Sequence, residues 1–231
     1  MNPAPQTRTP EFEPFLFGGK RPAAVGMDDV QLETRAVGLV DLPDGRVYAC
    51  DPLVPMDSQP LAHRLQCGRY LVVLFVVTGT EHGRPEVGTE CNAAAALLCS
   101  DKTPVRWELA AREGGPSNGA AYGVDSGTGG FMGHLAIEEA LNGDDPLGQA
   151  IMSALRDASG AVVSIADGVS AAAFRSGIGD GTYETWLGHD AQGQLAIILT
   201  DFQVVDSEDY VSRVHAQWAV RNAQKWWQFW R

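Results

Sequence analysis

The chain has 231 residues, 45% of them apolar and 20% charged, with 17 lysines and arginines against 29 aspartates and glutamates. The formal net charge of −12 argues against nucleic-acid binding, because phosphate binding needs clustered cations, and it suits a basic protein partner. The 26 glycines and 13 prolines exceed what a helical bundle usually carries and are typical of strands joined by many turns. The length is typical of one large domain, or of one domain with an additional segment.

The sequence gives no sign of a signal peptide or a membrane span. The first residues lack a cationic stretch followed by an apolar run. The most apolar window, residues 70–77, is far shorter than the roughly 20 residues that cross a bilayer. The four cysteines form no Cys-x-x-Cys pair and are expected to be buried, reduced thiols rather than metal ligands or nucleophiles. We therefore expect a cytoplasmic protein.

The first half of the chain predicts strands. Residues 1–26 hold five of the 13 prolines and are expected to form an extended arm. Residues 30–40 and 47–50 alternate in polarity around an Asp-Gly turn and predict a β-hairpin, which Asp51-Pro52 would end. Further strands are expected at 70–78, at 104–110 and at 90–99, where a strand of small residues is favoured over an alanine-rich helix.

The second half predicts two short helices and then more strands. Residues 111–130 are interpreted as a glycine-rich loop, and the helical spacing of apolar residues predicts helices over 135–141 and 147–157. Strands separated by glycine turns are expected at 160–165, 171–174, 183–187 and 194–200.

These elements indicate an α+β, β-rich fold. Its core would be a mostly antiparallel sandwich or barrel-like sheet, with a few short helices and a C-terminal helix. The predicted organisation is an extended proline-rich arm over 1–26, a single β-rich domain over 27–207, and an amphipathic, aromatic-rich helix over 208–231.

Three aspartates stand in turns and are the candidate site. Asp125, Asp180 and Asp201 lie beside glycines or at a strand end, where the backbone can approach a ligand and carboxylates can hold a hard cation. The alternative is that each caps its own turn through backbone amides. The twelve-residue calcium loop is absent, so no cofactor is expected, with a divalent cation as the alternative. The candidate ligand-binding residues are Asp125, Gly127, Thr128, Gly129, Gly179, Asp180, Gly181, Tyr183 and Asp201.

Catalysis is the weaker hypothesis for these turns. Asp125 and Asp180 would act as acid or base, and His134 is the nearest candidate base in the sequence. The segment around Ser126 does not match the Gly-x-Ser-x-Gly elbow of hydrolases. Zinc, phosphate-loop and dinucleotide motifs are also absent.

The last residues form an aromatic-rich tail. Trp226, Trp227 and Trp230 are candidate partner-binding residues, because an apolar patch of this kind marks a docking surface. The tail could instead fold back over the sheet, join two copies as a homo-oligomer, or touch a membrane surface.

A set of ordered motifs over residues 30–205 resembles a known family. The set is Asp51-Pro52, Gly68-x-Tyr70, Tyr122-Gly-Val-Asp-Ser-Gly-Thr-Gly-Gly-Phe131, Ser176-Gly-x-Gly-Asp-Gly-x-Tyr183, Gly188-x-Asp190, Gly193 and Asp201-Phe202. It resembles the uncharacterised bacterial domain-of-unknown-function family 4241. The resemblance implies no established activity. Gly130 and Gly133 stand where that family carries a cysteine and an aspartate, which weakens any enzymatic site there.

The favoured function is an acidic protein-binding module, of the kind that serves as an immunity protein and neutralises a basic partner such as a bacterial toxin. The first alternative is a hydrolase-like enzyme, or a small-ligand or metal-binding protein, that uses Asp125, Asp180 and Asp201. The second is a structural subunit that oligomerises through its C-terminal helix.

Overall fold

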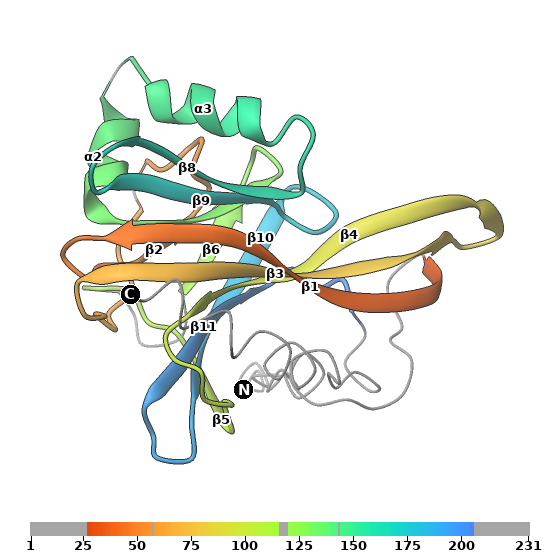
Figure 1. The fold of residues 1–231 in the computed structure, drawn as a ribbon, viewed down its shortest axis with the longest axis horizontal. Helices are drawn as coiled ribbons and strands as arrows, with labels where there is room; N and C mark the ends of the chain where they lie inside the picture. Colours follow the sequence, from red (N-terminus) through yellow and green to blue (C-terminus); the bar gives the residue numbers. More distant parts are fainter. Residues whose placement is uncertain (1–26, 57, 116–119, 143, 206–231) are drawn as a thin grey trace, which may run out of the picture.

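Two antiparallel β-sheets pack face to face in the computed structural model, which describes residues 27–56, 58–115, 120–142 and 144–205 (Figure 1). Helices α2 (His134–Leu141) and α3 (Pro146–Ala154) cover the side of the smaller sheet that faces away from the larger one. The β-rich, antiparallel prediction is therefore confirmed, and neither sheet closes into a barrel within the described ranges.

The larger sheet has seven strands in the order β1-β3-β4-β11-β10-β5, and β6 also pairs with β10. These strands are β1 (Met27–Leu42), β3 (Gly68–Glu81), β4 (Arg84–Leu98), β5 (Arg106–Leu109), β6 (Ala120–Val124), β10 (Gly181–His189) and β11 (Leu195–Asp201). The smaller sheet has the order β2-β7-β9-β8. Its strands are β2 (Tyr48–Cys50), β7 (Thr128–Met132), β8 (Gly160–Ala166) and β9 (Val169–Arg175).

The centre of the larger sheet is buried on both faces. Residues 72–77 of β3 form a continuous buried run, as the apolar sequence predicts. Beside them, residues 93–96 of β4 are four buried alanines. Propensity alone would make this segment helical, but small side chains suit a strand enclosed on both sides. The prediction of a strand at this position is confirmed.

Two predictions about the elements of the chain are wrong. The segments 30–40 and 47–50 do not pair as a hairpin, because β1 pairs with β3 in the larger sheet while β2 pairs with β7 in the smaller one. The segment 111–130 is not all loop, since it contains β6 and the first three residues of β7. Both strands are short and rich in small residues, so they lack the apolar alternation that marks most strands in a sequence.

Parts of β1, β3 and β4 extend beyond the body as a three-stranded arm (Figure 1). A β-bulge marks its base: Phe75 pairs with Ala94 and Val76 with Asn92, so Ala93 is the extra residue. The carbonyl of Ala93 accepts a hydrogen bond from Phe202 N at 3.0 Å. At the same place the Asn92 side chain donates to two carbonyl oxygens of the smaller sheet region, at 2.9 and 2.8 Å. The bulge thus coincides with the point where the arm separates from the body.

Aromatic side chains join the two sheets in the core. Phe174 of β9 has its ring centroid 5.4 Å from that of Phe131 and 5.8 Å from that of Phe202. All three are buried. None of the helices in the described part of the chain is long and apolar enough to cross a membrane. The predicted arm over 1–26 and the predicted C-terminal helix over 208–231 lie outside the described residues.

Candidate functional site

A buried carboxylate organises the glycine-rich loop between β6 and β7. Asp51 is 3% exposed and follows β2 directly. Its Oδ2 accepts hydrogen bonds from the backbone N–H groups of Asp125 at 3.0 Å and Ser126 at 2.9 Å. Its Oδ1 accepts from the Ser126 hydroxyl at 2.8 Å and from Leu53 N at 2.9 Å. The carboxylate therefore fixes a loop that lies more than 70 positions further along the chain.

Local sequence explains how Asp51 reaches this position. Cys50 pairs with Gly130 of β7, so β2 ends beside the loop. The bond from Leu53 N turns the chain at Pro52, which packs against Gly130 so closely that a Cβ there would lie 3.0 Å from Pro52 Cγ. The sequence pattern predicts only that Asp51-Pro52 ends a strand and indicates no further function for the aspartate.

A second loop, between β9 and β10, joins the first at Gly127. Asp180 Oδ1 accepts from Gly127 N at 2.9 Å, and Gly127 O accepts from Ser176 N at 3.0 Å. Gly127 has a φ of 65°, a conformation that glycine adopts without strain. We call these two segments, residues 125–128 and 176–181, the loop pair. Two motifs that are about 50 residues apart in the sequence are thus hydrogen-bonded to one another.

The buried side chain of Tyr183 stabilises the second loop. Its hydroxyl donates to the carbonyl of Gly179 at 2.7 Å and lies 3.2 Å from that of Ser176. The Ser176 hydroxyl donates to the same Gly179 carbonyl at 2.9 Å. Burial raises the pKa of Tyr183, so the phenol remains a hydrogen-bond donor at neutral pH. These contacts are structural bonds to the backbone.

A second buried tyrosine explains a glycine of the first motif. Tyr122 of β6 pairs with Tyr183 and is 5% exposed. Burial raises the pKa of Tyr122 well above its ordinary value, although the nearby Thr200 hydroxyl opposes the shift. A Cβ on Gly129 would lie 2.7 Å from the Tyr122 hydroxyl and 2.8 Å from the Phe174 ring. Only glycine therefore fits at position 129 without moving its neighbours.

The loop pair presents both charge and apolar surface to solvent. The side chains of Asp125, Ser126 and Asp180 are on exposed residues. Ile178 is 75% exposed, the highest value for a large apolar side chain in the described ranges. The loops are thus hydrogen-bonded to the buried side chains of Asp51 and Tyr183, and they expose an isoleucine and two carboxylates.

Two predicted site residues make other contacts than those that join the loop pair. Asp201 pairs with Glu184 of β10, and the next residue, Phe202, packs against the second loop, since a Cβ on Gly177 would lie 2.8 Å from Phe202 Cβ. Its Oδ1 accepts from Gln203 N at 2.9 Å, within its own turn. His134 begins α2, beyond the far end of β7. Its Nε2 lies 2.9 Å from Glu138 Oε1, and its Nδ1 lies 3.3 Å from the Tyr48 hydroxyl. His134 therefore lies apart from the loop pair, whereas Asp201 lies at a strand end beside its second loop.

The remaining predicted ligand-binding residues are in or beside the loop pair: Asp125, Gly127, Thr128, Gly129, Gly179, Asp180, Gly181 and Tyr183. Within the described ranges, no three His, Cys, Asp or Glu side chains lie close enough together to hold a metal ion. The loop pair exposes backbone groups and the carboxylates of Asp125 and Asp180, and its hydrogen bonds hold these groups in place. Sequence analysis missed Asp51, for which the only signal was its place in the ordered motif set.

The four cysteines are free thiols, as expected, but they are not all buried. Cys50 is buried and Cys67 is exposed. Burial raises the pKa of Cys50, and separately that of Cys99, to about 12. These two thiols are therefore poor nucleophiles at neutral pH.

Comparison with known proteins places these motifs in a family. No curated protein and no solved structure matches the chain. A family model described as "Protein of unknown function (DUF4241)" matches residues 40–200. The match includes Asp51 and both segments of the loop pair, and it excludes the part of β1 that forms one edge of the arm. Since the match covers most of the chain, the protein belongs to this family of unknown function, DUF4241.

Proposed function

We propose that this protein is an acidic protein-binding module that recognises a basic protein through the loop pair, in the manner of an immunity protein that neutralises a toxin. The observation that carries the proposal is the exposed Ile178, presented with Asp125 and Asp180 on loops that are hydrogen-bonded to the buried side chains of Asp51 and Tyr183. Protein interfaces typically bury apolar side chains at the centre and surround them with a polar, solvent-accessible rim.

Preorganisation supports this function. The bonds from Asp51 and Tyr183 hold the loop backbone before a partner arrives, so little conformational entropy is lost on binding. The net charge of −12 would attract a basic partner and accelerate its association. The negative charge would raise the association rate and select a basic partner, and Ile178 would supply the apolar contact.

The same contacts weigh against hydrolysis at these residues. Asp180 has one carboxylate oxygen committed to Gly127 N, and Asp51 has both oxygens committed to the first loop. The candidate base His134 is placed at the start of α2, against Glu138. A general base needs to lie within hydrogen-bond reach of the proton it removes. This separation therefore favours binding over acid–base chemistry.

The test is affinity capture from a lysate of the source cells with the full-length protein as bait. We expect one basic protein in a stoichiometric complex that dissociates at high salt. Ile178→Lys should reduce its recovery at least tenfold, since it replaces an apolar anchor with a charge that repels a basic partner. Asp180→Asn keeps an acceptor for Gly127 N while removing the charge, and should mainly slow association.

The matched control is Met152→Lys. Met152 lies on α3, is 65% exposed, and receives the same change in charge and polarity away from the loop pair. Recovery should be close to that of the parent protein. Equal recovery with Ile178→Lys and Met152→Lys, or capture of an acidic protein, would contradict the proposed function.

A further inference from the structure

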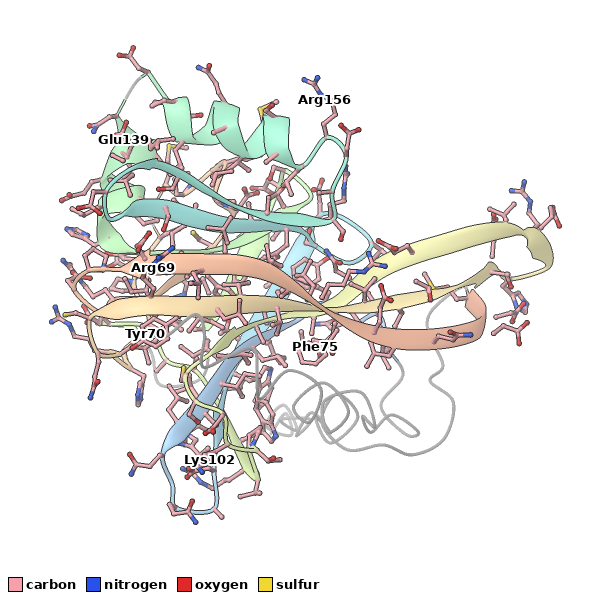
Figure 2. The ribbon with its side chains drawn as sticks, in the orientation of Figure 1. Arg69, Tyr70, Phe75, Lys102, Glu139 and Arg156 are labelled. Carbon is pink, nitrogen blue, oxygen red and sulfur yellow. The ribbon has the colours of Figure 1, made fainter. Side chains whose placement is uncertain are left out.

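The larger sheet has an outer face, which we define as the side turned away from the smaller sheet. Ladder partners share a face, so the register places one continuous set of apolar side chains there. Its central members are Val73, Phe75 and Val77 of β3, Ala96 of β4, Leu199 of β11 and Trp186 of β10. Figure 2 shows Phe75 at the base of the arm.

These side chains are buried, yet no described element lies across them. Their exposed fractions range from 0% to 4%. The helices lie beyond the smaller sheet, on the opposite side, and the described strands near the outer face belong to the larger sheet itself (Figure 1). Apolar surface of this extent is removed from water by packing against another apolar element. The outer face therefore requires an occupant.

We propose that residues 206–231 of the same chain are the occupant of the outer face. The described chain reaches the rim of this face just before that segment, where Phe202 N donates to Ala93 O at the base of the arm. Residues 1–26 instead join at Met27, which pairs with Glu81 at the arm tip. The tip is about 26 Å along β3 from Val73.

The length of the segment suits the face. The face spans the six strands from β1 to β5, or about 24 Å at a spacing of roughly 4.8 Å between strands. The 26 residues of segment 206–231 would extend about 39 Å even at the helical rise of 1.5 Å per residue. The segment is therefore long enough to cross the whole face.

The chemistry is also complementary. Segment 206–231 carries four tryptophans, and residues 210–231 carry four cations and no carboxylate side chain. At the edge of the outer face, Glu184 and Asp201 are direct cross-strand partners and are both half-buried. Like charges in this arrangement destabilise a sheet, and a cation beside them offsets the repulsion. The outer face thus suits the tryptophan-rich, cationic residues 210–231, while the three carboxylates of the segment all lie in residues 206–209, which lead to it.

The test uses the full-length protein with aromatic side chains removed. The tail variant changes Trp226, Trp227 and Trp230 to serine, and the matched variant changes Phe12, Phe15 and Phe17 to serine. We expect the tail variant to melt about 10 °C lower or more, because three large apolar contacts are lost, and to bind the apolar dye ANS. The matched variant should change both readouts much less. A stronger effect in the matched variant would assign the face to residues 1–26 and overturn the proposal.

Two further measurements separate the other occupants. Light scattering of the parent protein should give a monomer mass whose value does not change in the tail variant. A dimer that the tail variant dissociates would assign the face to a second copy. If the tail variant does not fold, hydrogen exchange on the parent protein decides the question. Slow exchange over residues 206–231 supports the proposal, and complete exchange within seconds overturns it.

Discussion

Replacing Asp51 with alanine should be among the most destabilising single substitutions in this fold. The change leaves three backbone N–H groups and the Ser126 hydroxyl without their acceptor. Each bond to a buried charged acceptor contributes about 1.5–3 kcal/mol, but Asp125 and Ser126 are exposed and water would satisfy part of their donors. We therefore expect the free energy of unfolding to fall by about 3–5 kcal/mol.

Asp51→Asn refines the prediction, because all four groups that face this carboxylate are donors. An amide keeps one oxygen and turns its NH₂ group toward two of those donors, so we expect a loss of about 2–4 kcal/mol. The matched control is Asp190→Asn. Asp190 is 7% exposed, and its Oδ1 alone accepts from both Gln192 N and Gln194 N. The amide retains that oxygen, and the loss should stay below about 1 kcal/mol.

The assay is urea unfolding at pH 7, followed by circular dichroism and by tryptophan fluorescence. The result that refutes the reasoning is a loss below about 1 kcal/mol for both Asp51 variants. Equal losses for Asp51→Asn and Asp190→Asn would also refute it. The loss of stability would then depend on the burial of the aspartate alone, and not on whether both of its oxygens accept hydrogen bonds.

Three further predictions follow from packing, thiol burial and charge. Gly129→Ala should destabilise by about 1–3 kcal/mol in urea unfolding, because its Cβ meets two buried rings, while Gly123→Ala, with no atom within 4 Å, should be nearly neutral. Cys67 is exposed and should react first with DTNB at pH 8. Cys50 and Cys99, whose pKa burial raises to about 12, should react only after denaturation, and simultaneous reaction of all three would contradict this. The bidentate hydrogen bond from Arg35 lowers the pKa of Glu90 in the folded protein. The ion pair therefore stabilises the fold at a pH above about 4.5, the pKa of Glu90 in the unfolded chain, and this stabilisation is lost as the pH falls through the lower pKa of the folded state. Glu90→Gln should therefore cost about 0.5 kcal/mol at pH 7 and less at pH 3.5, and a cost that grows in acid would be inconsistent with the ion pair.

The sequence predicted the elements that depend on neighbouring residues, but not the pairings between segments that are far apart in the chain. Strong local patterns, such as the apolar run in β3 and the helical spacing in α3, indicated the correct elements. The pairing of β1 with β3 was missed, because an Asp-Gly turn favours a hairpin locally while burial assigns β1 and β2 to different sheets. β7 was missed because Gly129 and Gly130 are poor strand formers that only close packing explains.

The candidate site was predicted in part for the same reason. Asp180 and Gly127 could be selected as glycine-turn residues, and the structure joins them directly. Asp201 lies at a strand end beside the second loop, but its Oδ1 accepts within its own turn, and its cross-strand partner Glu184 is decided by the strand register. Asp51 could not be identified as an anchor, because its partners are more than 70 residues away and nothing in its own turn indicates them.

The bulge at Ala93 has a consequence for insertions and deletions among relatives. Asn92 and the carbonyl of Ala93 bond to the body at the point where the pairing of β4 with β11 ends, and β3 and β4 continue beyond it as a paired ribbon. A single-residue insertion or deletion in β3 between Phe75 and Val77 would turn Val77 to the opposite face, whereas a change of two residues there would keep it on its own face. Relatives should therefore vary in length at the tip of the arm, beyond Val77, while the number of residues at its base stays constant.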